Sequence, residues 1–217
     1  MRFRAAIFDL DGTLLDTLED LAGAMNAVLT RHGFPPYPVS AYRGFVGEGI
    51  EALVRRALPR PLPPEETVAE RVREMRAEYD RRCLACTRPF PGVPELLAAC
   101  RKAGAALAVL TNKPEEPARR LVQALLPDEG FRAVCGARAG LPRKPDPAGA
   151  HELLDALGVP PREAFLLGDS GVDMQTAVAA GLFPAGALWG FRPAGELLAA
   201  GARLLASSPL DLVPWIR

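Results

Sequence analysis

Two carboxylates stand two residues apart near the start of the sequence, at Asp9 and Asp11, and Gly12 and Thr13 follow them. They come directly after the apolar run Ala5 to Phe8, which is typical of a buried strand in a parallel sheet. Two acids at one strand end repel each other unless positive charge lies between them, so the pair favours a site for a divalent cation. Asp-Gly is also ordinary turn chemistry, and these residues alone leave a plain polar turn equally open.

Other polar residues follow apolar runs farther along the chain. A run that ends at Leu110 is followed by Thr111 and Asn112, and a run that ends at Leu167 leads to Asp169. Open α/β sheets bind their ligands outside the carboxyl ends of their strands. We therefore expect these side chains to meet at one edge of a sheet.

Four short motifs, taken in order, resemble those of the haloacid dehalogenase-like hydrolases. They are Asp9-Leu-Asp11-Gly-Thr13, Thr111-Asn112, Lys144-Pro-Asp-Pro147 and Gly168-Asp169-Ser-Gly-Val-Asp173. Each motif alone is weak, but four in register, three of them directly at strand ends, are a strong signal. The resemblance covers nearly the whole chain. It implies hydrolysis of phosphate monoesters, because the phosphatases of the family carry an acid at the position of Asp11 and the dehalogenating branch does not.

The resemblance also implies a role for each matched residue. Asp9 is expected to be the nucleophile, which would form an aspartyl-phosphate intermediate. Asp11 is expected to protonate the leaving alkoxide and then to take a proton from the attacking water. Lys144 would supply positive charge to the nucleophile and the phosphate. Phosphoryl oxygens would be bound by Thr111 and by the backbone amides of Asn112 and Gly12.

Mg²⁺ is the cofactor that the resemblance implies. It is expected on Asp9, on Asp169 and on the backbone carbonyl of Asp11, with water and phosphate completing its coordination. Asp173 lies one helical turn beyond Asp169 and could hold a metal-bound water. An acid near a helix N-terminus is equally well explained by the helix itself.

Residues outside the four motifs are expected to select the substrate, because the motifs handle only the phosphate. The stretch Phe45 to Leu58 is similar to the cap segment of phosphoglycolate phosphatases, which makes 2-phosphoglycolate the expected substrate. Gly47 and Gly49 would let the backbone approach a ligand, although a plain turn between helices explains them as well. A substrate carboxylate could be bound by Arg43, Arg55 or Arg56, although arginines on helices more often face solvent.

An α/β sheet is needed to bring these residues together. After Thr13 the hydrophobic spacing becomes helical, and residues from about 15 to 85 contain four amphipathic helices and no convincing strand. From Pro89 onward strands and helices alternate, which predicts a Rossmann-like parallel sheet with helices on both faces. The predicted core domain spans residues 1–14 and 87–217, and a small helical bundle, the cap domain, is inserted at residues 15–86.

Two residues are candidate N-caps and so predict where two helices begin. Ser40 is a candidate cap for a short second helix of the bundle. Asp146 is a candidate N-cap, with Pro147 at the first helical position.

The composition excludes several classes of protein. The 26 basic and 26 acidic side chains give no broad positive field for nucleic acid or an anionic membrane. Cys83 and Cys86 form a lone C-x-x-C without two further zinc ligands at matching spacing. No apolar stretch reaches membrane-spanning length. Because the first predicted strand begins close to residue 1, we expect no signal peptide. We expect a cytoplasmic monomer or homodimer that acts on a small phosphorylated metabolite.

Other functions stay open on the sequence alone. Within the family they are a broad sugar-phosphate or nucleotide phosphatase, a pyrophosphatase and a β-phosphoglucomutase-like enzyme. Outside the enzymes, a phospho-accepting receiver-like signalling domain also arrays acids, a Thr and a Lys at strand ends. Receiver domains are shorter, however, and have no helical insertion after the first strand.

Overall fold

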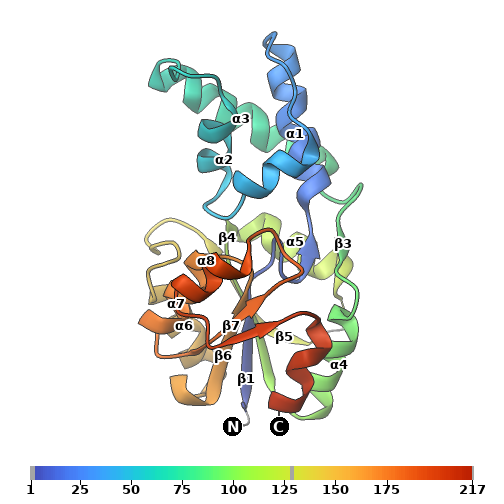
Figure 1. Ribbon diagram of the computed structural model, residues 1–217, viewed down its shortest axis with the longest axis vertical. Coiled ribbons are helices and arrows are strands. Elements are labelled where there is room, and N and C mark those ends of the chain that lie inside the picture. The colour runs from blue at the N-terminus through green and yellow to red at the C-terminus, as the bar shows by residue number, and fades with distance from the viewer. Residues whose placement is uncertain (1–2, 128–129, 217) are drawn as a thin grey trace. The chain divides into compact units, whose positions relative to one another are not determined.

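The chain divides into two compact units in the computed structural model, which describes residues 3–127 and 130–216. Unit 1 comprises Met1–Leu15 with Pro89–Arg217, and unit 2 comprises Asp16–Arg88. Two short strands, β2 (Leu15–Asp16) and β3 (Arg88–Pro89), pair where the chain passes between the units (Figure 1). The domain boundaries expected from the sequence, after residues 14 and 86, stand as our proposal for dividing the chain.

Unit 1 is built on a six-stranded sheet in the order β5-β4-β1-β6-β7-β8 (Figure 1). Its strands are β1 (Ala5–Phe8), β4 (Ala106–Pro114), β5 (Phe131–Ala137), β6 (Ala164–Gly168), β7 (Phe183–Ala187) and β8 (Leu204–Ala206). All neighbouring strands pair in parallel. Every carboxyl end therefore lies at the same edge, and the segment after β1 is flanked by the ends of β4 and β6.

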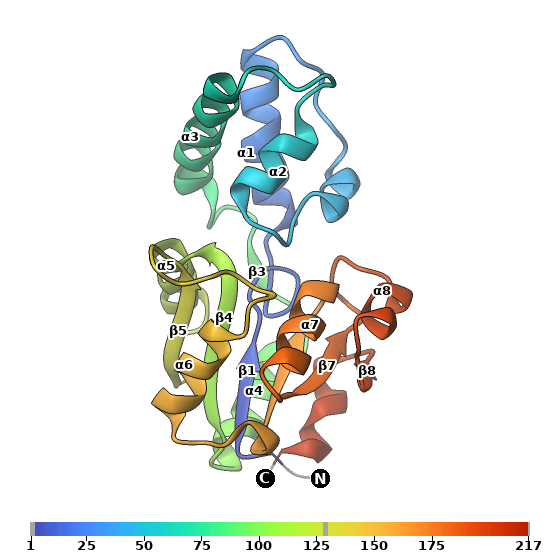
Figure 2. The ribbon, with the colours of Figure 1, turned by 90° about the vertical axis from the view of Figure 1, so that its left-hand side faces the viewer.

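Helices cover both faces of this sheet, as Figures 1 and 2 show. The α-helices are α4 (Val93–Lys102), α5 (Glu115–Leu125), α6 (Ala148–Leu157), α7 (Gly171–Ala179) and α8 (Ala194–Ala199). Two 3-10 helices, η2 (Pro161–Glu163) and η3 (Pro209–Trp215), complete the unit. The Rossmann-like α/β fold expected from the alternating pattern is confirmed.

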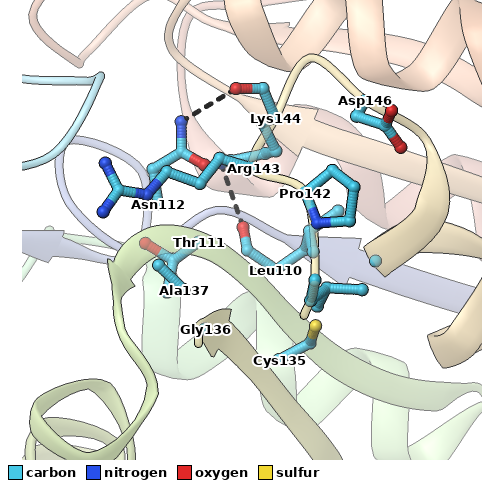
Figure 3. Close-up of a pocket in the computed structure, with 12 residues that line it drawn as sticks. Leu110, Thr111, Asn112, Cys135, Gly136, Ala137, Pro142, Arg143, Lys144 and Asp146 are labelled. Atoms are coloured by element: carbon cyan, nitrogen blue, oxygen red, sulfur yellow. Dashed lines mark hydrogen bonds between the residues drawn. The ribbon is translucent and has the colours of Figure 1, made fainter. Parts of the chain in front are cut away.

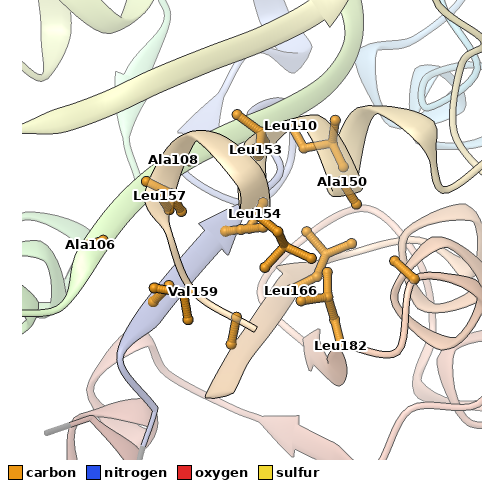
Figure 4. Close-up of a cluster of buried hydrophobic side chains, with 14 of the residues drawn as sticks. Ala106, Ala108, Leu110, Ala150, Leu153, Leu154, Leu157, Val159, Leu166 and Leu182 are labelled. Atoms are coloured by element: carbon orange, nitrogen blue, oxygen red, sulfur yellow. The ribbon is translucent and has the colours of Figure 1, made fainter. Parts of the chain in front are cut away.

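Strand alternation divides the core of unit 1 into two layers. On one face Ala108 of β4 and Leu166 of β6 belong to one buried cluster with Leu153 and Leu157 of α6 (Figure 4). On the other face Phe8 of β1 packs edge-on against Phe165 of β6, with 5.9 Å between the ring centroids. Because β1 and β6 are buried on both faces, these two strands are continuously apolar, which makes them easy to recognise in the sequence.

Unit 2 contains α1 (Leu18–Arg31), a 3-10 helix η1 (Val39–Gly44), α2 (Ile50–Ala57) and α3 (Glu65–Arg82). The buried Asp20 ties the end of the unit to its first helix, because its carboxylate accepts bonds from Cys86 N at 3.1 Å and from Thr87 Oγ1 at 2.7 Å. The helical bundle expected here is present, but its short second helix is 3-10. Ser40 lies inside it and Pro38 precedes it, so the expected Ser40 cap is wrong.

Two further boundaries differ from the sequence-based expectation. β4 continues through Thr111 to Pro114 instead of ending at Leu110. Helix α6 begins at Ala148, so the N-cap is Pro147, and Asp146 Oδ1 accepts a bond from Ala148 N at 2.9 Å. Within the described ranges, no helix combines the length and the apolarity that crossing a membrane requires.

Candidate active site

The segment after β1 carries Asp9 and Asp11 into a tight turn. Asp9 N donates to Leu167 O of β6 at 2.9 Å, so Asp9 is still held against the sheet. The next turn residue, Gly12, has a φ of +86°, and a Cβ there would lie 2.4 Å from Asp169 Oδ2. Any larger residue would displace Asp169 as well as strain the backbone. The glycine of the first motif therefore lets the β1 turn approach the carboxylate from β6.

Asp169 and Asp173 come from the end of β6 and the first turn of α7. Ser170 is the N-cap of α7, where its hydroxyl and the Asp173 carboxylate form a capping box. Asp173 Oδ2 accepts bonds from Ser170 N at 3.1 Å and from Ser170 Oγ at 2.5 Å. Through Oδ2, Asp173 therefore acts as a capping acid at the N-terminus of α7, which is one of the two explanations that the sequence left open.

Lys144 places its ammonium group among three acceptors. Nζ donates to Asp9 Oδ1 at 2.8 Å, to Asp173 Oδ1 at 2.6 Å and to Leu110 O at 3.0 Å. The side chain is 3% exposed. Because an ammonium has three protons and each has an acceptor, the charge is held in one position. Asp173 therefore serves both the α7 cap and the orientation of Lys144.

Thr111 and Asn112 lie near the carboxyl end of β4 and are almost fully buried. Asn112 Nδ2 donates to Lys144 O at 3.2 Å, which links β4 to the loop that carries Lys144 (Figure 3). A small cavity of about 10 Å³ is lined by Thr111, Asn112 and Lys144 among others. It has room for about one water molecule. These residues therefore pack closely beside the carboxyl end of β4.

Lys113 is a charged residue of the site that the motifs did not indicate. Its Nζ donates to both oxygens of Asp11, at 2.9 Å to Oδ1 and at 2.8 Å to Oδ2. The Lys113 side chain is 4% exposed and that of Asp11 is 14% exposed. The signal available in the sequence was its position directly after Thr111-Asn112, at the end of an apolar run that the sequence predicts as a strand.

The loop after β7 also contributes to the site without a sequence signal. Phe191 N donates to Asp169 Oδ2 at 2.8 Å, and Thr13 Oγ1 donates to Asp169 Oδ1 at 3.1 Å. Trp189 Nε1 donates to Thr13 O at 2.9 Å. Gly190 lies so close that a Cβ there would be 2.2 Å from the Asp169 Cβ. Both oxygens of the Asp169 carboxylate are thereby oriented by the loops after β1 and β7.

The electrostatics of the cluster show a deficit of positive charge. Burial, reinforced by Asp173 and Asp11 and opposed by Lys144, raises the pKa of Asp9 from 3.8 to about 7. Burial and the charges of Asp9 and Asp173 raise the pKa of Asp169 well above its ordinary value, although Phe191 N and Thr13 stabilise the ionised form. Burial alone would lower the pKa of Lys144, but the neighbouring Asp173 and Asp9 outweigh it and raise the value.

The donor set fits a hard divalent cation. Among the described residues, Asp9, Asp169 and Asp173 each offer a carboxylate oxygen, and these atoms lie within 4.8 Å of one another. A single buried ammonium cannot balance three carboxylates, and oxygen donors are those that Mg²⁺ and Ca²⁺ prefer. The side chain of Asp11 is outside this group and is paired with Lys113; its expected contribution was the backbone carbonyl.

The candidate substrate-binding residues of unit 2 lie in η1, in α2 and in the turn between them. Arg55 and Arg56 form ion pairs with glutamates of the same unit, and Arg56 also donates to a backbone carbonyl there. Arg43 is exposed in η1. Gly47 and Gly49 lie in the turn that leads into α2. Arg55 and Arg56 are thus held by contacts within their own unit.

The arrangement in unit 1 suits transfer of an anionic group to a carboxylate. Asp9 has one oxygen bound by Lys144, in an environment that favours additional positive charge. A second carboxyl, Asp11, lies two residues away and is held separately. One carboxyl can then act as nucleophile while the other transfers protons.

Comparisons with known proteins agree with this geometry. The sequence profile described as "Haloacid dehalogenase-like hydrolase" matches residues 6–187. A phosphoglycolate phosphatase of Rhodospirillum rubrum is 40% identical over 185 residues, which are 82% of this chain and 77% of the relative. An N-acetylmuramic acid 6-phosphate phosphatase of Pseudomonas aeruginosa is 33% identical over 98% of this chain and 94% of its own length.

A solved structure from Lactobacillus delbrueckii subsp. bulgaricus, described as a candidate phosphoglycolate phosphatase, superposes with a TM-score of 0.91 at 32% identity. The match covers 98% of each chain. The family resemblance and the class of hydrolase expected from the four motifs are confirmed by these matches.

Proposed function

This chain belongs to the haloacid dehalogenase-like hydrolases, and from that premise we propose that it is a Mg²⁺-dependent phosphatase of a small phosphate monoester. The observation that carries the proposal is the convergence of Asp9, Asp169 and Lys144 at the carboxyl edge of the sheet. A phosphate ester carries up to two negative charges. A carboxylate can attack its phosphorus only where positive charge offsets the repulsion. In this cluster Lys144 and a divalent cation would supply that charge.

The residues that we propose for Mg²⁺ are Asp9, Asp169 and, from the family resemblance, the backbone carbonyl of Asp11. When bound, the ion supplies positive charge against the nucleophile and the phosphate. Asp173 lies beside this set, but Ser170 and Lys144 already engage its two oxygens. We therefore assign Asp173 chiefly to holding Lys144 in place.

The reaction that we propose has two steps. In the first, an Asp9 oxygen forms a bond to phosphorus while the bond from phosphorus to the leaving oxygen breaks, and Asp11 gives its proton to that oxygen. In the second, Asp11 takes a proton from water as the water oxygen attacks phosphorus and releases the Asp9 carboxylate. The net change is ester plus water to alcohol plus phosphate. Lys144 keeps Asp9 oriented in both steps, and Thr111 with the amides of Asn112 and Gly12 binds phosphoryl oxygens.

The substrate that we propose first is 2-phosphoglycolate, and N-acetylmuramic acid 6-phosphate is the second candidate. The two relatives at 40% and 33% identity carry these activities in their names. Both compounds are phosphate monoesters that also contain a carboxylate. A cationic side chain of unit 2 is the group expected to recognise it. Arg43 of η1 is the residue that we propose to test for this role, and Gly47 and Gly49 would allow close approach of the backbone.

Initial rates of phosphate release would test the proposal. The assay compares 2-phosphoglycolate, N-acetylmuramic acid 6-phosphate and glucose 6-phosphate, each with Mg²⁺ and after treatment with EDTA. A charge-assisted hydrogen bond to the substrate carboxylate should raise kcat/KM about tenfold or more. We therefore expect kcat/KM for the two esters that carry a carboxylate to exceed that for glucose 6-phosphate by this factor. Equal kcat/KM for all three esters would defeat the substrate assignment, and undiminished turnover in EDTA would defeat the assignment of the metal.

Substitution of Arg43 would test the recognition of the carboxylate separately. Arg43→Ala should raise KM for 2-phosphoglycolate about tenfold and leave KM for glucose 6-phosphate unchanged. Arg76, which is exposed on α3, provides the matched control in Arg76→Ala. An equal change for both esters would contradict the role of Arg43.

A further inference from the structure

We propose that Lys113 is a positioning residue of the reaction, which holds the Asp11 carboxyl group where the leaving oxygen and the attacking water receive and give up their protons. The inference rests on the proposed phosphatase function. It adds a second lysine whose task differs from that of Lys144, and no motif points to it.

The contacts divide the positive charge of the site between two carboxyl groups. Lys144 donates to Asp9 and Asp173, whereas Lys113 donates to both oxygens of Asp11 at 2.8 and 2.9 Å. Both ammonium groups belong to side chains that are less than 5% exposed. An ion pair this well shielded from water holds its geometry far better than a pair on the surface.

The backbone of Lys113 is itself fixed. It lies in β4 between Leu110 and Pro114, where the register with β5 shifts, and such irregularities re-aim side chains near active sites. Its N–H donates to Thr111 Oγ1 at 3.2 Å. Helix α5 begins two residues later at Glu115. The ammonium group therefore projects from a strand end that the sheet and the following helix hold in place.

The two hydrogen bonds from Lys113 restrict how the Asp11 carboxyl group can move. A lone carboxyl can rotate about its terminal torsion, which is broad for Asp, and proton transfer requires an oxygen within hydrogen-bond reach of the reacting atom. Lys113 binds both oxygens and so fixes the plane of the group. When one oxygen carries the proton for the leaving group, the other still accepts a bond from Lys113. The same orientation then serves the return transfer from water.

A leaving group that needs no proton would reveal this role. Departure of p-nitrophenolate needs no acid, whereas departure of the alkoxide from 2-phosphoglycolate does. Lys113→Met should therefore lower kcat/KM for 2-phosphoglycolate about 10- to 100-fold, part of the 10²–10⁴-fold that acid–base catalysis contributes, and change kcat/KM for p-nitrophenyl phosphate less than about threefold. Lys102→Met, on the exposed end of α4, is the control with the same change of charge.

The second step gives an independent readout. With Asp11 misplaced, hydrolysis of the phosphorylated enzyme should become slow, so Lys113→Met should release p-nitrophenol in a burst of about one equivalent per enzyme before the steady state. A merely structural ion pair predicts no burst and an equal loss for both esters, and either result would overturn the proposal.

A double-mutant cycle shows whether Lys113 acts through Asp11. In an Asp11→Asn background, Lys113→Met should change kcat/KM for 2-phosphoglycolate by less than about twofold, because the group it positions has already lost its function. Multiplicative losses would refute the proposal. Lys113→Gln, which retains a donor, serves if the methionine variant fails to fold. A wild-type enzyme that hydrolyses neither ester with Mg²⁺ would instead overturn the proposed function, whatever the variants do.

Discussion

Gly190 offers a sharp test of how the loop after β7 supports the site. A Cβ at this position would lie 2.2 Å from Asp169 Cβ and 2.5 Å from Gly12 O. The first distance is about 1.2 Å shorter than the 3.4 Å at which ordinary van der Waals contact begins. One neighbour is backbone and the other is the stem of a short side chain, so neither can move aside without moving the Asp169 carboxylate.

Gly190→Ala should therefore displace Asp169 by on the order of 1 Å, a misplacement that costs about 10²-fold in rate where a catalytic group is concerned. We expect kcat/KM for the preferred ester to fall by about that factor. We also expect the Mg²⁺ concentration for half-maximal activity to rise about tenfold or more, because Asp169 is a proposed ligand. Isothermal titration with Mg²⁺ measures the affinity without reference to turnover.

The control is Gly195→Ala, which adds the same methyl group in α8 where no atom lies within 4 Å of the new Cβ. This variant should keep wild-type Mg²⁺ affinity and rate, because the added methyl group meets no neighbouring side chain. Wild-type Mg²⁺ affinity and kcat/KM in Gly190→Ala would refute the reasoning, because the close approach of the loop would then place no constraint on Asp169.

Two further predictions concern the charges of the cluster. Lys144→Met leaves Asp9 and Asp173 buried without their shared cation. Urea denaturation in EDTA should therefore show a loss of about 3–5 kcal/mol in the free energy of unfolding, and almost no loss for Lys102→Met. Equal losses in the two variants would contradict a structural role for the buried Lys144 ammonium. Because the pKa of Asp9 is raised from 3.8 to about 7, this carboxyl stabilises the metal-free fold fully below pH 3.8, and that contribution falls by about 1.4 kcal/mol per pH unit until it is lost above pH 7. Since Mg²⁺ must displace the proton, the rise in Tm caused by Mg²⁺ should grow from about pH 5 to pH 8; a constant rise in Tm would contradict the assignment.

The sheet was predictable from the sequence because its strands are short apolar runs that end in polar residues. Ala5–Phe8 matches β1 residue for residue. The carboxyl-end rule then brought Asp9, Thr111 and Asp169 to one edge without any knowledge of the loops between them, whereas Lys144 was assigned to the site only through the family resemblance. Boundaries were less certain where local and tertiary effects compete. β4 runs past Leu110 because Thr111 and Asn112 are buried polar residues, which hydropathy alone does not assign to a strand.

The supporting contacts could not be predicted because they join residues distant in sequence through geometry that no pattern encodes. Lys113 and Asp11 are 102 positions apart, and Phe191 and Asp169 meet through a backbone N–H that any residue except proline would supply. The closeness of Gly190 to Asp169 is likewise a property of the folded loops. The sequence could show which residues end the strands, but not which neighbours orient them.

The central claim is that Asp9 receives the phosphoryl group, and trapping that intermediate tests it most directly. The wild-type enzyme with Mg²⁺ would be quenched in acid during turnover of its preferred ester and reduced with borohydride, which converts an aspartyl phosphate to the alcohol. Tandem mass spectrometry should place the modification on Asp9, and Asp9→Asn should show neither the modification nor turnover. Modification of another residue, or turnover that survives in Asp9→Asn, would contradict the account.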